Sequence, residues 1–226
     1  MIKAIVTDIE GTTSSLSFVH DVLFPYARAN LAEFVQLHQN DPEVAVLLAD
    51  VARLAEENLD IEALIALLIS WIDADKKITP LKSLQGLIWA AGYKSGAYKG
   101  HIYPDAVNNL QQWKALGLDL YVYSSGSVFA QKLLFAHTEF GDLTGLFSGY
   151  FDTQIGAKRE SSAYAEIARQ LGLTGRQIVF LSDIKEELDA AALAEFNTVW
   201  LVRGQQPNAQ AEHKQVNSFD QITLTV

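Results

Sequence analysis

The sequence predicts an α/β protein with a doubly wound parallel sheet and a helical cap domain inserted into it. Two observations support this fold. Strand and helix patterns alternate from residue 118 to residue 202, which is typical of parallel strands joined by right-handed crossovers. Between residues 14 and 100 the pattern is helical throughout. We therefore assign residues 1–16 and 100–226 to the sheet domain and residues 17–99 to the cap.

Composition narrows the possible functions. The 226 residues are 49% hydrophobic, which is enough to bury one full core and a smaller appended one. Lys and Arg number 17 against 27 Asp and Glu, so the net charge of −10 argues against a nucleic-acid partner. Cysteine is absent, which excludes disulfides, thiolate nucleophiles and thiolate zinc sites. The most apolar segment, residues 61–72, is too short to cross a bilayer, and we expect a cytoplasmic protein without membrane contact.

The first strand ends in two acidic residues. An apolar run over residues 2–6 leads into Asp8 and Glu10, and Gly11 and Thr12 follow. Strand alternation would place both carboxylates on one face, at the sheet edge where open α/β sheets bind ligands. A strand followed by a capping Asp is the plainer interpretation. Backbone N–H groups of Gly11 and Thr12 could also bind an anion, which favours a functional site.

The cap is predicted from helical spacing of apolar residues over 18–37, 43–57, 61–74 and 80–91. Pro42 and Pro80 mark first turns, and Gly92 is expected to end the last helix. Segments 14–17 and 92–101 then form a pair of hinges. A free-standing partner-binding module is the alternative, but a segment inserted after the first strand must lie near that strand's carboxyl end.

The remaining elements complete the sheet domain. We expect strands over residues 118–123, 150–151, 178–181 and 198–202, and helices over residues 104–116, 128–136, 161–171 and 185–195. The polar segment 204–218 is predicted to be a loop.

Three further groups follow predicted strands or loops at the same edge. Ser124 and Ser125 lie before a helix, where backbone N–H groups can bind phosphate, although an N-cap is the plainer interpretation. Lys158 lies two residues after Gly156 in a loop and would supply the fixed cation that phosphoryl transfer needs, with Arg159 as its competitor. Asp183 either caps a helix or binds Mg²⁺, which prefers oxygen ligands. The five His lack ligand spacing, and none is assigned to a metal.

These motifs, in this order, resemble those of the haloacid dehalogenase superfamily. Residues 8–13, DIEGTT, resemble its first motif, DxDx[TV], with Glu10 in place of the second Asp. A more specific likeness is to the enolase-phosphatases of methionine salvage. It rests on FVHDVLFPY at 18–26, QGLIWAAGYKSGAYKGHIYPD at 85–105, YSSGSVFAQKLLF at 123–135, DTQIGAKRES at 152–161 and FLSDIKEELDAA at 180–191.

The resemblance implies a reaction and a set of roles. The expected enzyme enolises 2,3-diketo-5-methylthiopentyl-1-phosphate and then removes phosphate, with one Mg²⁺ per chain. Asp8 would be the nucleophile, Glu10 the acid and base, and Lys158 the cation, with Ser124 and Ser125 on the phosphate. The metal ligands would be Asp8, Asp183 and the main-chain carbonyl of Glu10, with Glu187 holding waters around the metal.

The sequence also suggests contacts from the cap, the kind of partner and two rival functions. Trp89, Tyr93 and Lys94 are candidate substrate contacts, although cap core is the plainer interpretation of Trp89. We expect a monomer that acts on a small phosphorylated diketone. The alternatives are another capped phosphatase or phosphomutase of the superfamily, and a non-catalytic protein that uses the cap as a binding surface.

Overall fold

The computed structural model describes residues 1–206, 208 and 211–225. The chain divides into two compact units, one formed by Met1–Leu16 with Gly100–Val226 and the other by Ser17–Lys99. We call them the sheet unit and the helical unit and describe each by itself. That the helical unit acts as a cap remains a prediction.

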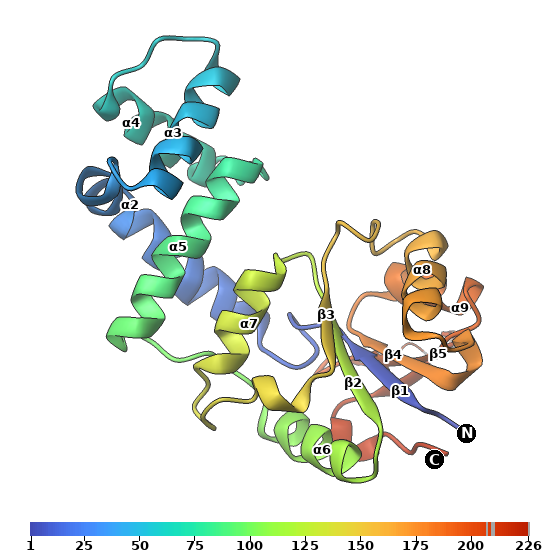
Figure 1. Cartoon of the computed structure of the whole chain (residues 1–226). Coiled ribbons are helices and arrows are strands. Elements are labelled where there is room, and N and C mark those ends of the chain that lie inside the picture. The colour runs from blue at the N-terminus through green and yellow to red at the C-terminus, as the bar shows by residue number, and fades with distance from the viewer. Residues whose placement is uncertain (207, 209–210, 226) are drawn as a thin grey trace. The chain divides into compact units, whose positions relative to one another are not determined.

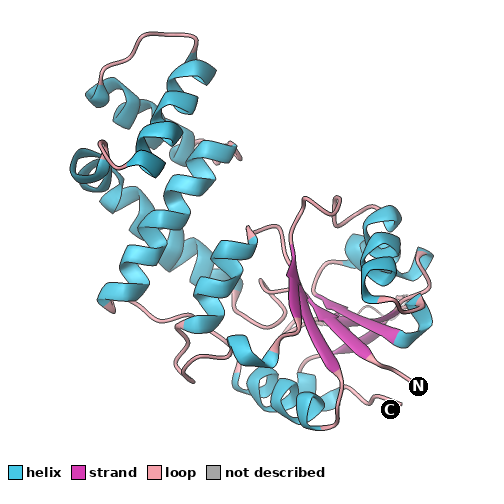
Figure 2. Ribbon diagram, in the orientation of Figure 1, coloured by secondary structure: helices cyan, strands magenta, loops and turns pink. Residues whose placement is uncertain are grey.

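The described residues of the sheet unit form six parallel strands in the order β3-β2-β1-β4-β5-β6, which confirms the predicted parallel sheet (Figure 1). The strands are β1 (Ala4–Thr7), β2 (Asp119–Tyr123), β3 (Gly149–Phe151), β4 (Ile178–Ser182), β5 (Asn197–Leu201) and β6 (Lys214–Val216). The helices are α6 (Pro104–Ala115), α7 (Val128–Ala136), α8 (Ser161–Leu171) and α9 (Lys185–Leu193), with short 3₁₀ turns η2 (Thr144–Leu146), η3 (Gly175–Gln177) and η4 (Phe219–Gln221). Figure 2 shows helices on both sides of the sheet, as double winding requires.

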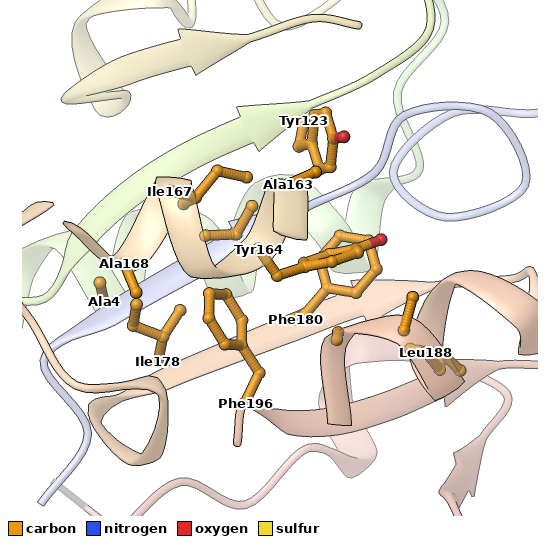
Figure 3. Packing of buried hydrophobic residues seen from close by; sticks show 13 residues of the cluster. Ala4, Tyr123, Ala163, Tyr164, Ile167, Ala168, Ile178, Phe180, Leu188 and Phe196 are labelled. Carbon is orange, nitrogen blue, oxygen red and sulfur yellow. The ribbon is translucent and has the colours of Figure 1, made fainter. Parts of the chain in front are cut away.

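The core of the sheet unit extends to the carboxyl ends of the strands, where Tyr123 ends β2. Helices α8 and α9 bury their inner faces against β1 and β4 in one hydrophobic cluster (Figure 3). Within it the Tyr164 ring makes edge contacts with Tyr123, Phe180 and Phe196, at centroid distances of 5.6, 5.0 and 5.7 Å. Such edge-to-face pairs add to the stability gained by burial. The two tyrosines also carry hydroxyl groups into the loop that holds Lys158, as described below.

The helical unit has a hydrophobic core of its own. It contains α1 (Leu16–Phe18), which begins at the unit boundary, the π-helical turn η1 (Val19–Leu23), α2 (Phe24–His38), α3 (Pro42–Ala55), α4 (Ile61–Asp73) and α5 (Thr79–Ser95). Side chains such as Leu31, Leu68 and Leu84 are fully buried among α2 to α5. Pro42 is the first residue of α3, as predicted, because proline lacks the N–H that a first turn leaves unbonded.

Two predictions of secondary structure are wrong by more than two residues. Helix α5 does not end at Gly92 but continues to Ser95, and Gly96 closes it in the left-handed conformation at φ 73°. Gly92 is glycine for a different reason, since a Cβ atom there would lie 2.7 Å from the rings of Tyr26 and Tyr98. The predicted loop 204–218 contains β6, whose backbone pairs with β5 although Lys214-Gln215-Val216 shows no strand pattern. Residues 207 and 209–210 of that prediction lie outside the described residues.

Candidate active site

The predicted site residues follow three neighbouring strands of the sheet. Asp8 follows β1, Ser124 follows β2 and Asp183 follows β4, and β1 lies between the other two. The chain winds outward in opposite directions from the β1–β4 pair, and ligands bind at the carboxyl ends of strands at such a reversal point. The Asp8 N–H donates to the Leu181 carbonyl at 2.9 Å, which ties the end of β1 to β4.

A buried lysine links two carboxylates at the centre of this edge. Lys158 Nζ lies 2.7 Å from Asp8 Oδ1 and 2.7 Å from Glu187 Oε2, and the three side chains are 6%, 6% and 10% exposed. Burial alone would lower the pKa of Lys158, but the charges of Asp8 and Glu187 raise it. Burial, reinforced by Asp8, raises the pKa of Glu187. The lysine is therefore held in its charged form beside Asp8.

Aromatic core residues position this lysine. The Tyr164 hydroxyl donates to the Lys158 carbonyl at 2.7 Å, and the Tyr123 hydroxyl donates to the Gly156 carbonyl at 2.9 Å. Lys158 Nζ also lies 5.7 Å from the centroid of the Tyr123 ring, within range of a cation–π interaction. The hydroxyl groups of Tyr123 and Tyr164, two residues of the cluster in Figure 3, therefore anchor the loop. Lys158 is buried beside Asp8, whereas Arg159 is exposed.

Asp8 itself is held through one of its two oxygens. The Ile9 N–H donates to Oδ1 at 2.8 Å, and Lys158 contacts the same oxygen. Among the described residues, Oδ2 makes none of these contacts. The carboxylate is thus stabilised as an anion on one side and left available for attack on the other.

Asp183 has the environment of a metal ligand. Its Oδ1 is buried, and no described residue donates a hydrogen bond to it. Burial and the charge of Asp8 raise the pKa of Asp183 to about 7. Asp183 does not cap α9, whose N-cap position is Ile184 without a side-chain cap. A buried carboxylate oxygen without a donor, near a second carboxylate, is suited to bind a cation.

The loop after β1 leaves room for that carboxylate. Gly11 has φ 73°, and a Cβ atom on it would overlap Asp183 Oδ2. Among the described residues no group of three Asp, Glu, His or Cys side chains is arranged to hold a metal. Two carboxylates with a main-chain carbonyl and waters are, however, what Mg²⁺ commonly takes, so the oxygen donors present fit the predicted ion.

The Ser124 loop differs from the expected phosphate site at a helix N-terminus. The first N–H groups of α7 are already capped, because Asp152 Oδ2 accepts from Val128 N at 3.3 Å and Ser127 Oγ accepts from Ala130 N at 3.3 Å. Ser124 is buried, and its Oγ accepts from the Gly126 N–H at 3.2 Å. Ser125 is exposed on the same loop. Phosphate binding at this loop stays a prediction, and it would use the serine side chains and the loop N–H groups rather than the capped N-terminus of α7.

Glu10 and Glu187 lie in the sheet unit with environments that the strand pattern did not predict. Strand β1 ends at Thr7, so Glu10 is placed by a turn and not by strand alternation, and it is half-buried. Glu187 contacts Lys158 and accepts from Ser182 Oγ at 2.9 Å. Its predicted role toward waters around the metal stays a prediction.

The three candidate contacts of the helical unit differ in exposure. Trp89 is half-buried, and its Nε1 donates to the Leu23 carbonyl at 2.8 Å. Tyr93 is buried against the Tyr98 ring, at a centroid distance of 4.7 Å. Lys94 is exposed. Trp89 and Tyr93 thus have structural roles within the unit, and their contact with a substrate stays a prediction.

Sequence reasoning missed Arg203, which fixes the loop after Asp8 from the far end of the chain. Its Nε donates to the Thr12 carbonyl at 2.9 Å, and its guanidinium lies 3.8 Å from the centroid of the Tyr103 ring. Asp105 pairs with the same guanidinium at 3.0 Å. Arg203 follows β5, at the same edge as Asp8, and this position is the only signal that the sequence offered.

Comparison with known proteins agrees with this geometry. The haloacid dehalogenase-like hydrolase family matches residues 2–195. The Enolase-phosphatase E1 of Thioalkalivibrio sulfidiphilus is 61% identical over 90% of this chain and 91% of its own, and that of Yersinia pestis is 54% identical over 100% and 99%. The chain belongs to the enolase-phosphatase E1 family.

A solved structure also resembles the whole chain. The crystal structure of the UTR4 protein of Saccharomyces cerevisiae matches with a TM-score of 0.84 and 33% identity, over 98% of this chain and 100% of that one. Membership in the enolase-phosphatase E1 family confirms the predicted superfamily and the assignment as a hydrolase. Among the described residues, no helix has the length and apolar character needed to cross a membrane.

Proposed function

We propose that this chain enolises 2,3-diketo-5-methylthiopentyl-1-phosphate and then hydrolyses the phosphate ester. The products are the acireductone 1,2-dihydroxy-3-keto-5-methylthiopentene and inorganic phosphate. The names of the relatives, at 54 to 61% identity, support this reaction. The structural observation that best supports the proposal is the Asp8 carboxylate, which is bonded to Lys158 through one oxygen and available for attack through the other. We further propose that the chain acts as a monomer in the cytoplasm.

The phosphatase half uses Asp8 as nucleophile. Its Oδ2 attacks phosphorus, the bond from phosphorus to the ester oxygen breaks, and the leaving oxygen takes a proton from Glu10. Water then attacks phosphorus in the aspartyl phosphate while Glu10 accepts its proton, which regenerates Asp8 and releases phosphate. Lys158 and the Ser124 hydroxyl bind the phosphoryl oxygens. Bound Mg²⁺, held by Asp8, Asp183 and the Glu10 carbonyl, would neutralise negative charge on the phosphoryl group.

The enolase half needs a base next to the phosphate-bearing carbon. We propose that Glu10 removes the C1 proton while Lys158 polarises the neighbouring carbonyl. Glu10 suits both tasks because it is half-buried on the turn after β1, two residues after Asp8.

The experiment follows both halves at once. Ultraviolet absorbance reports the enol and a phosphate assay reports hydrolysis. We expect Asp8→Asn to retain enolisation and to lose phosphate release by at least about a thousandfold, and Glu10→Gln to lose both. Full enolisation by Glu10→Gln would assign the base elsewhere. Absence of phosphate release by the parent protein with Mg²⁺ present would refute the phosphatase.

The rival functions receive less support. A general phosphatase or phosphomutase would share the fold, but the relatives at 54 to 61% identity bear the enolase-phosphatase name. A non-catalytic binding protein would not need a buried cation against the Asp8 carboxylate. Phosphate release from several phosphomonoesters, measured beside release from the diketone phosphate, separates these cases.

A further inference from the structure

A buried glutamine lies beneath the loop that carries Ser124. Gln131, on α7, is 2% exposed. Its Nε2 donates to the Gly126 carbonyl at 2.8 Å and to the Phe151 carbonyl at 2.9 Å. One amide nitrogen thus joins the loop after β2 to the end of β3.

The two carbonyls are part of the framework around Ser124. The Phe151 carbonyl also accepts from the Ser124 N–H at 3.2 Å, and the Gly126 N–H donates to Ser124 Oγ at 3.2 Å. Since Ser124 Oγ accepts from Gly126, its own hydrogen is available to donate to a ligand. The direction of that hydrogen depends on Gly126, and Gln131 fixes Gly126 through its carbonyl.

The Gln131 amide has one acceptor, Oε1, that is buried and receives no hydrogen bond from the described residues. The reversed amide would set Oε1 against two carbonyl oxygens, so the orientation is fixed. A buried acceptor without a donor is destabilising, and an apolar side chain of the same size would avoid that loss. The Gln131 amide therefore holds the loop in place although its own buried Oε1 destabilises α7.

We propose that Gln131 is a positioning residue for phosphate, which aligns Ser124 and the loop N–H groups with the phosphoryl oxygens of a phosphomonoester. It touches neither substrate nor metal and acts through Gly126 and Phe151. This role deepens the proposed function and rests on phosphate binding at that site.

The test compares phosphate binding with stability. Gln131→Met removes the donor at nearly constant volume, and Gln131→Glu keeps the shape but cannot donate when ionised. Binding of inorganic phosphate is measured by calorimetry with Mg²⁺ present, and KM and kcat are measured beside it. We expect the phosphate dissociation constant and KM to rise together by about tenfold in Gln131→Met, and further in Gln131→Glu, with kcat within about threefold of the parent.

Asn197, which is exposed, provides a control with the same bonding pattern. Its Nδ2 also donates to two main-chain carbonyls, of Arg176 and Ile178, at 2.9 and 3.1 Å, but at the start of β5, at the opposite edge of the sheet. Asn197→Leu should lower thermal stability and leave phosphate binding unchanged. Parent-like phosphate binding by either Gln131 variant overturns the proposal, as does an equal loss in Asn197→Leu. If the parent binds phosphate but fails on the diketone phosphate, the proposed function fails and the Gln131 comparison still stands.

Discussion

Gly11 allows the loop after β1 to approach Asp183. Its backbone lies in the left-handed region, and the position of a Cβ atom is already occupied by Asp183 Oδ2. Gly11→Ala must therefore displace the proposed metal ligand. We expect the Mg²⁺ concentration for half-maximal phosphate release to rise by about 10- to 100-fold.

Gly117 separates this effect from backbone strain. It has a similar φ of 84°, and a Cβ atom there would have no atom within 4 Å. Gly117→Ala should lose about 1 to 2 kcal/mol of stability, as any residue forced into this conformation does, with an unchanged Mg²⁺ requirement. Equal Mg²⁺ requirements in the two variants would show that Asp183 is not the group that Gly11 accommodates.

Candidate site residues could be selected from the sequence where a reactive or metal-binding side chain directly follows a predicted strand. Asp8 and Asp183 follow apolar strands, and their acidic side chains indicated a phosphate or metal site before any geometry was known. Lys158 was selected by its motif, because its sequence neighbours do not show that it is buried. Gln131 and Arg203 were missed because their side chains bond to the carbonyl groups of Phe151 and Thr12, 20 and 191 residues away, which no local pattern encodes.

At the scale of elements, Asp105 ties α6 to the C-terminal segment. Its carboxylate pairs with Arg203 and accepts from Ser218 Oγ at 2.9 Å and Phe219 N at 2.8 Å. Burial would raise the pKa of Asp105, but these partners, Arg203 foremost, lower it. A carboxyl with a lowered folded pKa stabilises the protein fully above its unfolded pKa of about 3.9, and the contribution is lost as pH falls through the folded value.

Asp105→Asn should therefore destabilise the protein in a pH-dependent way. We expect a loss of about 2 to 4 kcal/mol in the free energy of unfolding at pH 7, because Arg203 loses its carboxylate. The difference from the parent should shrink below about pH 4 in urea titrations at several pH values. Asp142, an exposed acid bonded only to neighbouring Thr144 in the described contacts, is the control, and Asp142→Asn should change stability little. A loss for Asp105→Asn that is constant with pH would contradict the assigned charge pairing.

Helices and strands were predictable where the spacing of apolar residues and the residues typical of helix ends indicate the same boundary. The helices that begin at Pro42 and Pro104 start at the predicted residues, because proline is favoured in a first turn. Glycine misled the prediction at Gly92, because a close aromatic contact and a helix end both require glycine. Strand β6 was not predicted, because a short edge strand is defined by its backbone pairing to β5 and not by side-chain alternation.

At the scale of the whole molecule, the two units have separate cores. Leu68 is fully buried in the helical unit and Ile167 in the sheet unit. Truncation of such a side chain to Ala costs about 2 to 5 kcal/mol. We expect Leu68→Ala to raise amide exchange over residues 17–99 and Ile167→Ala to raise it over the strands of the sheet, each with little effect on the other unit. A uniform rise over the whole chain in both variants would mean that the units unfold together.

Ligand protection then tests which unit binds which part of the substrate. The groups proposed to hold Mg²⁺ and phosphate all belong to the sheet unit. Mg²⁺ with inorganic phosphate, at about 100 times the dissociation constant, should stabilise that unit by about 2.7 kcal/mol and leave exchange over residues 17–99 unchanged. A diketone phosphonate with the methylthio tail should also protect residues 85–95 if Trp89, Tyr93 and Lys94 contact that tail. Equal exchange in that segment with phosphate and with the phosphonate would remove these three residues from the substrate site.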